Sequence, residues 1–312
     1  MSATKWTLTA AALAACFTFM TPNTAAADGI LVADSQIPAA ERNKLWSEIE
    51  AYRAVNPAAF EAVRSLKGHR PETYKKWRNP VPAVGMELRR LKQAGLLPML
   101  EALAFQAPER GTLTEREYRA LKVGLLEATG MLRDGRSATI LQQAYLNATH
   151  PDVIWAAGEA LGRLCDDSSY KLLSKHLTGA RKEGAIAGLG QCRRIDGTEK
   201  LAGMLASAAD EAEATAIAKA LGVAASSWAW ATYGPEAQAQ GLEVRRIAAE
   251  ALVPAFIRLQ GKARKAASKG LTMAEYPGMA ALVRQHRHRA NEPTAQALDR
   301  LVARIEKRLS RR

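Results

Sequence analysis

Aromatic residues make up only 6% of this 312-residue chain, and runs that alternate Val, Ile or Thr with polar residues are scarce. Both shortages argue against a β-sandwich or β-barrel, because strands are rich in β-branched and aromatic side chains. Alanine is abundant and 48% of the residues are hydrophobic, which favours closely packed helices over disorder. The composition therefore predicts an all-α protein.

Long hydrophobic runs are also missing, since none approaches the roughly 18–20 residues of a transmembrane helix. Lys5, the apolar run 8–20 and the alanines at 25–27 instead form the pattern of a cleavable secretory signal. Residues 1–27 thus predict export, to the periplasm or outside the cell, with cleavage after Ala27. Leu13-Ala14-Ala15-Cys16 also resembles a bacterial lipobox, and the alternative is a membrane-anchored lipoprotein that carries its lipid on Cys16.

Common catalytic signatures do not occur in the sequence. The phosphate-binding loop G-x-x-x-x-G-K-[ST], the nucleophile motif G-x-S-x-G and the zinc motif H-E-x-x-H are all missing. His286 and His288 are close together, but flanking arginines would repel a metal ion. The adjacent Asp166 and Asp167 lie where a loop and a helix cap are expected. We therefore expect no catalytic residue, metal site or cofactor.

Cysteine is rare, with three in the chain and two, Cys165 and Cys192, beyond the signal. No C-x-x-C occurs, so zinc and dithiol redox motifs are excluded. In an exported protein the pair could form a disulfide, which requires Cα atoms within about 7 Å. The alternative is two buried thiols that act as small hydrophobic residues.

A repeating pattern runs through the middle of the chain. Short strings end successive apolar helical patterns at Gly130, Gly162, Gly190, Gly222 and Val253, with spacings of 32, 28, 32 and 31 residues. The residue two positions earlier is always small, which would let neighbouring helices approach closely: Ala128, Ala160, Gly188, Ala220 and Ala251. We take the four glycines as repeat-packing positions. A period of this length is typical of stacked helical units.

Each unit also contains a second helix. In the first three units, apolar side chains four residues apart follow the glycine at a fixed distance, namely Leu141 and Tyr145, Leu173 and Leu177, and Leu201 and Leu205. Turn and capping residues such as Asp134-Gly135 and Asp196-Gly197 separate the two helices. Each unit is therefore predicted to be a helix, a short turn and a second helix.

This pattern resembles the HEAT-repeat family, particularly the short bacterial repeats of phycobilisome lyases. The resemblance rests on Asp152-Val153, Ala156-Ala157 and Glu159-Ala160-Leu161-Gly162-Arg163-Leu164, and on the string at 243–252, which matches a first helix. It implies an α-solenoid of about five helical hairpins over residues 116–260. Residues 28–115 form an N-terminal helical region with one degenerate repeat, in which Arg89 or Arg90 replaces the glycine. Residues 261–312 form a basic C-terminal cap.

Positive charge is concentrated at the C-terminal end. The net charge is +13, and residues 241–312 contain 16 basic and 6 acidic residues. Residues 291–312 predict one amphipathic helix, whose candidate polyanion-binding side chains are Arg300, Arg304, Lys307 and Arg308. A solvated basic face that only maintains solubility is the alternative.

Aromatic residues interrupt the fourth unit. Trp228, Trp230 and Tyr233 lie beside a Gly-Pro turn, and Trp and Tyr are enriched where proteins bind one another. They are candidate partner-binding residues, and the alternative is that they fold back to fill the gap left by the irregular repeat.

Three functions follow from the sequence. The leading hypothesis is a non-enzymatic scaffold of the cell envelope that binds a protein or peptide on its solenoid surface. The second is a basic binder of an anionic envelope polymer or membrane surface, with no nucleic-acid partner expected. The resemblance implies a third, a lyase-type enzyme acting on a tetrapyrrole, against which the predicted export argues.

Overall fold

Helices account for the regular structure of the chain. The computed structural model describes residues 28–66, 83–231 and 235–310, and no strand occurs in these segments. The expected signal at 1–27 lies outside the described residues. The N-terminal helices are α1 (Ala39–Val55), α2 (Pro57–Arg64), α4 (Ala83–Arg90) and α5 (Leu96–Ala104). The central helices are α6 (Glu115–Leu132), α7 (Ala138–Asn147), α8 (Pro151–Leu164), α9 (Asp167–Lys175), α10 (Lys182–Cys192), α11 (Ile195–Ser207) and α12 (Glu211–Ala224). The C-terminal helices are α13 (Ser227–Trp230), α14 (Pro235–Arg258), α15 (Gly261–Ala274), α16 (Met279–Arg287) and α17 (Glu292–Leu309).

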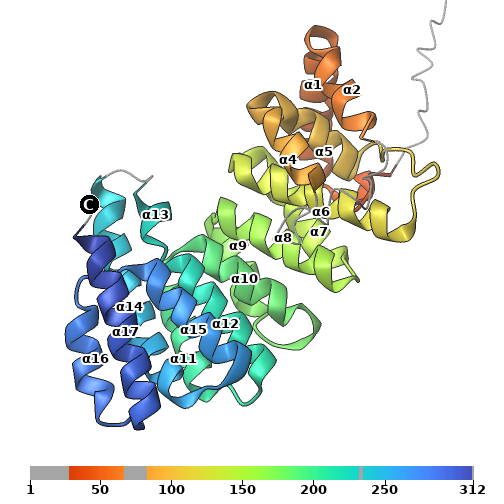
Figure 1. Cartoon of the computed structure of the whole chain (residues 1–312). Helices are drawn as coiled ribbons and strands as arrows, with labels where there is room; N and C mark the ends of the chain where they lie inside the picture. The colour runs from red at the N-terminus through yellow and green to blue at the C-terminus, as the bar shows by residue number, and fades with distance from the viewer. Residues whose placement is uncertain (1–27, 67–82, 232–234, 311–312) are drawn as a thin grey trace, which may run out of the picture.

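Alternate helices of the chain form one continuous stack. In the order α4, α6, α8, α10, α12 and α15, each helix packs against the next, so the stack runs from the N-terminal to the C-terminal part of the molecule (Figure 1). The helices α7, α9 and α11 each follow a stack helix in the chain. Helix α7 packs against α8, α9 packs against α8 and α10, and α11 packs against α10 and α12. Of the six predicted positions, Leu141, Tyr145, Leu173, Leu201 and Leu205 are buried on these second helices. Leu177 is half-buried and lies two residues beyond the end of α9.

A left-handed residue ends most of the stack helices. Arg133, Cys165 and Arg193 have φ angles of +51°, +47° and +56°, and each lies three residues after a predicted repeat glycine. Lys92 after α4 and Glu275 after α15 share this conformation, with φ angles of +50° and +43°. Glycine is the usual residue at such a helix end, so ordinary side chains here carry a strain of about 1–2 kcal/mol. Their common position marks these helices as equivalent members of the stack.

Close backbone contacts join the stack helices at the predicted glycines. A Cβ atom added to Gly130 would lie 2.5 Å from the Cα atom of Ala160, and one on Gly190 would lie 2.7 Å from the carbonyl oxygen of Ala220. A Cβ atom on Gly162 would overlap the carbonyl oxygen of Gly188. In each contact, the repeat glycine of one helix faces a small residue of the next stack helix. That small residue lies two positions before the repeat glycine of its own helix.

The fourth contact differs from the prediction. Gly222 faces Gly270 of α15, where an added Cβ atom would lie 2.7 Å from the Gly270 Cα atom. The string at 243–252, predicted to be the next first helix, lies instead in α14, which packs against the second helix α11. Pro254 lies inside α14 and does not end it. The stack therefore continues through α15, across the boundary expected after residue 260.

Helix α4, in the region where a degenerate repeat is predicted, also lies close to the next stack helix. A Cβ atom on Gly124 of α6 would lie 3.0 Å from the Cβ atom of Val84 in α4. Lys92, with its positive φ, lies three residues after Arg89, so Arg89 and not Arg90 occupies the glycine position. Helix α5 is almost wholly buried, and residues 29–32 run along its end through hydrogen bonds such as Ile30 N to Ala102 O at 3.0 Å.

Gly162→Ala tests the close contacts. The added methyl group would overlap the Gly188 carbonyl, so we expect the free energy of unfolding to fall by about 1–3 kcal/mol. Gly203→Ala is the matched control, because Gly203 is an exposed residue of α11 with no atom within 4 Å of an added Cβ. There the better helix propensity of alanine should raise the free energy of unfolding by about 1 kcal/mol. Denaturant unfolding of both variants measures the two effects, and equal shifts would contradict the proposed packing.

Candidate binding surfaces

The tryptophans of the irregular unit have opposite environments. Trp230 is buried, its Nε1 donates a hydrogen bond to Ala224 O at 2.8 Å, and its ring lies against Gly241. It packs with Ala224 and Val244 in a small separate cluster, so this residue fills the gap between α12 and α14. Trp228 is 78% exposed. Tyr233 lies outside the described residues. Of the three candidates, Trp228 is the one whose described side chain is available to a partner.

The predicted basic residues occur on α17 with different partners. Helix α17 begins after Asn291, whose side chain accepts a hydrogen bond from Thr294 N, and Leu298, Leu301 and Ile305 are its buried face. Arg300, Arg304 and Lys307 are exposed and make no ion pair with the described residues. Arg308 lies 3.8 Å from the buried Glu275, at the end of α15. Three of the four cations are therefore available to an anion.

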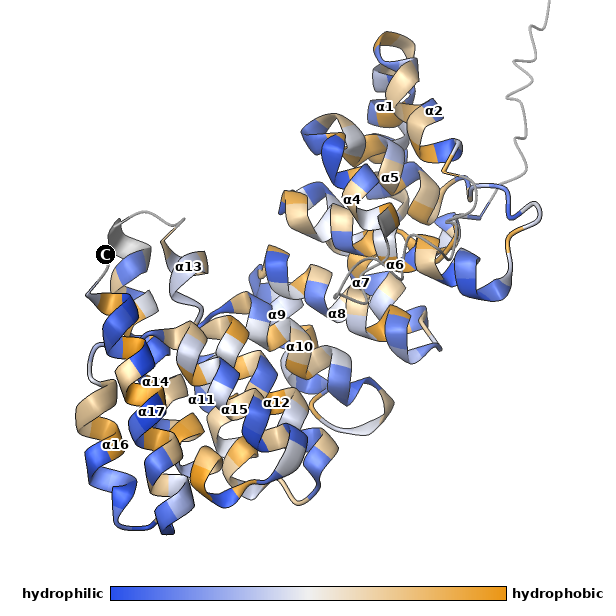
Figure 2. Ribbon diagram, viewed as in Figure 1, coloured by the Kyte–Doolittle hydropathy of each residue, from blue (hydrophilic) through white to orange (hydrophobic). Residues whose placement is uncertain are grey.

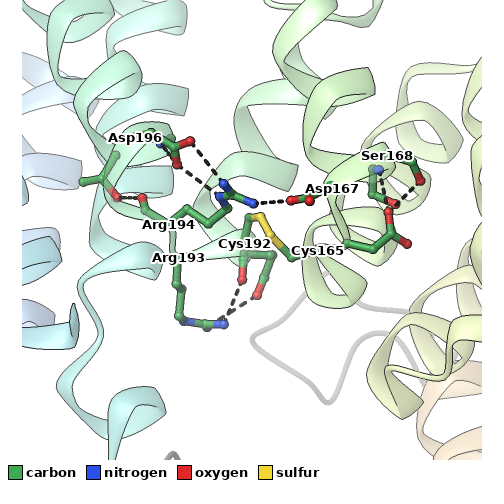
Figure 3. The surroundings of a disulfide bond; sticks show 12 residues. Cys165, Asp167, Ser168, Cys192, Arg193, Arg194 and Asp196 are labelled. Carbon is green, nitrogen blue, oxygen red and sulfur yellow. Dashed lines mark hydrogen bonds and ion pairs between the residues drawn. A yellow bond between two sulfur atoms is a disulfide. The ribbon is translucent and has the colours of Figure 1, made fainter. Parts of the chain in front are cut away.

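The disulfide joins two neighbouring stack helices. Cys165, the left-handed residue after α8, is bonded to Cys192, the last residue of α10, with Cα atoms 5.1 Å apart (Figure 3). Of the two possibilities left open by the sequence, the structure therefore contains the disulfide. The bond lies in an open pocket of about 620 Å³ whose polar lining residues include Arg163, Arg194 and Asp196.

Ion pairs connect Arg194, at the edge of this pocket, to residues at the beginnings of α9 and α11. The Arg194 guanidinium lies 2.9 Å from Asp167 and 3.2 Å from Asp196, and its charge lies 4.3 Å from the centre of the Tyr170 ring. Asp166 caps α9 by accepting a hydrogen bond from Ser169 N at 2.7 Å. The adjacent aspartates thus act as a cap and an ion-pair partner, as the sequence analysis expected of a loop. At this pocket the Arg194 charge is therefore already paired with carboxylates.

Helix α6 contains a buried acid. Glu127 of α6 is 8% exposed, and its Oε2 accepts no hydrogen bond from the described residues. Burial raises the pKa of Glu127, and the charges of Arg163 and Arg89 offset only part of this increase. The equivalent Glu159 of α8 is instead bound by Arg163 at 3.0 Å and by Gln191 at 3.2 Å. The Gln191 contact joins α10 to α8, whereas the Arg163 contact lies within α8.

The described residues contain no group of three or more His, Cys, Asp and Glu side chains that could hold a metal ion. His286 makes a contact of 3.1 Å to Leu282 O within its own helix. Along the described parts of the chain, no helix is both long and apolar enough to cross a membrane.

Sequence reasoning missed a second basic row, on α15. Lys262, Lys265 and Lys269 are exposed on this helix at positions i, i+3 and i+7. The helical spacing was visible in the sequence, but the side of α15 that packs against α12 and α14 was not. Comparison of the sequence with protein-family models and with curated proteins finds no match.

Replacing both cysteines with serine measures the contribution of the disulfide. The bond closes a loop of 27 residues, and loop entropy predicts a loss of about 3.5 kcal/mol in the free energy of unfolding. Reductant should lower the thermal midpoint of the wild type and leave that of the Cys165→Ser/Cys192→Ser variant unchanged. A wild type insensitive to reductant in partly unfolding conditions would contradict this expectation.

Glu127→Gln tests the buried acid through the pH dependence of the free energy of unfolding. Because the pKa of Glu127 is raised in the folded state, its contribution to stability is present at low pH and is lost as pH rises through the folded-state pKa. The Gln variant does not titrate at this position. Its free energy of unfolding relative to the wild type should therefore increase from acidic to neutral pH. If the difference in the free energy of unfolding stays constant or falls as pH rises, the charges of Arg163 and Arg89 affect the pKa of Glu127 more than burial does.

Proposed function

We propose that the protein is a non-enzymatic scaffold built as an α-solenoid of HEAT-like helical hairpins and exported to the cell envelope. The continuous stack from α4 to α15 supports the solenoid, as do the equivalent left-handed helix ends. Units of this kind bury their apolar faces against each other and leave a long surface for binding. The secretory pattern of residues 1–27 and the disulfide between Cys165 and Cys192 support the location.

We propose that the partner is a protein or peptide bound around Trp228. The observation that carries this proposal is the 78% exposure of Trp228, compared with the burial of Trp230 two residues later. The burial of Trp230 fixes α13 against α14, so Trp228 is displayed from an anchored turn. A large aromatic side chain held in this way loses little conformational entropy on binding, and Trp is enriched among the residues that dominate interface energies.

A second candidate function is binding of an anionic ligand by α17. It is favoured by Arg300, Arg304 and Lys307, which are exposed and have no acidic partner among the described residues. Cations that only maintain a solvated surface are commonly interspersed with acids, as in the Arg246 pairs with Glu243 and Glu250 on α14.

Crosslinking of the mature protein in its own cell envelope tests the leading proposal. We expect Trp228→Ala to lower recovery of one discrete protein by at least about tenfold, because hot-spot residues contribute about 2 kcal/mol or more. Val55→Ala is the matched control, since Val55 is an apolar residue with the same exposed fraction of 78% on α1. Recovery that is equal for wild type and both variants would reject Trp228 as the binding residue.

A further inference from the structure

The lysines of α15 form a row of exposed positive charge. This helix contains Lys262, Arg264, Lys265 and Lys269 and no acidic residue. The three lysines are exposed and form no ion pair with the residues that the structure describes. Arg264 is partly buried, stacks 4.6 Å from the Phe256 ring and donates a hydrogen bond to Thr294. The lysines are therefore the part of α15 that an external anion can reach.

Two contacts fix α15 and α17 as parallel neighbours. Near the beginning of both helices, Arg264 Nη2 donates to Thr294 Oγ1 at 2.8 Å. At their far ends, Arg308 lies 3.8 Å from Glu275. The helices also pack side by side at the C-terminal end of the molecule (Figure 1). Counting along the helices from these two contacts places Lys269 level with residues 299–302 of α17, which include Arg300.

This alignment turns two separate rows into one line of charge. Lys262, Lys265 and Lys269 lead along α15 to the level of Arg300, and the line continues through Arg304 and Lys307 on α17. With a rise of 1.5 Å per residue, the six cations extend over about 22 Å. Figure 2 shows hydrophilic residues along both helices. We call these six residues the basic track.

The neighbouring acids do not neutralise the basic track. Asp299 is paired with Arg287 of α16 at 3.2 Å, and Glu292, which accepts a hydrogen bond from Gln296 at 3.1 Å, acts electrostatically on the same arginine. Glu306 is exposed, but its position on the helical wheel places it on the side of Asp299 and away from Arg304. Glu211 of α12 accepts a hydrogen bond from Lys262 N at 2.6 Å, so one carboxylate adjoins the N-terminal end of the basic track. From Lys265 to Lys307 the basic track keeps an excess of positive charge.

The basic track has no apolar anchor. The large hydrophobic residues exposed in the described parts of the chain are Trp46, Val55, Met131, Leu146, Trp228 and Leu242, and none lies on α15 or α17. Surface helices that dock on a bilayer usually insert such side chains beside their cations. A narrow line of cations without an anchor instead matches a ligand whose charges repeat along one dimension.

We propose that the basic track of α15 and α17 binds a linear anionic polymer, which lies along the six cations and crosses from one helix to the other. This proposal deepens the second candidate function by naming the partner class and by adding α15 to the site. It requires a chain long enough to span both helices, so short oligomers should bind weakly. Each cation neutralised on binding also makes the affinity more sensitive to salt.

Fluorescence titration of the full mature protein with long-chain inorganic polyphosphate tests the proposal. Lys265→Gln/Lys269→Gln and Arg300→Gln/Arg304→Gln should each weaken binding about tenfold or more at low salt and reduce the salt dependence. Lys171→Gln/Lys175→Gln is the matched control, because these exposed α9 lysines remove the same charge away from the basic track. We expect this control to change binding less than twofold. Thermal unfolding verifies that each variant is folded.

Several results would overturn the proposal. These are a loss of binding in the α9 control as large as in the track variants, an unchanged affinity of the α15 variant, or binding of triphosphate as tight as that of the long polymer. Tighter binding to vesicles of phosphatidylglycerol and phosphatidylcholine in equal parts, again lost in the track variants, would identify a membrane surface instead. The track variants keep Trp228, so protein capture in the envelope separates failure of this proposal from failure of the scaffold.

Discussion

The structure depends on how closely the backbones of consecutive stack helices approach each other. At the four repeat glycines there is no room for a Cβ atom, and the facing residue is alanine or glycine each time. Larger side chains would push the helices apart and expose the apolar residues that the second helices bury, such as Leu141 and Leu173. The order of the stack, the position of the turns and the surfaces on its outside all follow from this spacing.

The sequence predicted those parts of the fold that depend on local spacing. The repeat glycines, the buried pairs on α7 and α11, and the amphipathic α17 were all visible as periodic patterns. The position of α14 was not, because its string at 243–252 has the composition of a stack helix and only tertiary contacts place it beside α11. The glycine that meets Gly222 comes from α15, nearly fifty residues later in the sequence.

For the candidate surfaces too, the sequence located the segments but not their tertiary contacts. Composition located the aromatic and basic segments, but it could not distinguish Trp228 from Trp230, since burial depends on the fit against Gly241. Composition also could not show that α15 lies beside α17, because their alignment depends on the contacts Arg264–Thr294 and Arg308–Glu275. If both proposals hold, the protein binds two kinds of partner near one end of the stack and could bring a protein to an anionic polymer.

The disulfide has a mechanical consequence for such a protein. It joins the end of α8 to the end of α10, where their backbones already meet at Gly162 and Gly188. Separation of these two helices at this end would require the covalent bond to break, whereas the other described stack contacts are non-covalent, such as the ion pairs Arg119–Asp152 and Lys182–Glu213. A pull on either end of the molecule would therefore be absorbed outside this pair, between α4 and α8 or between α10 and α15. The pair α8–α10 is thus the part of the described stack that is covalently closed.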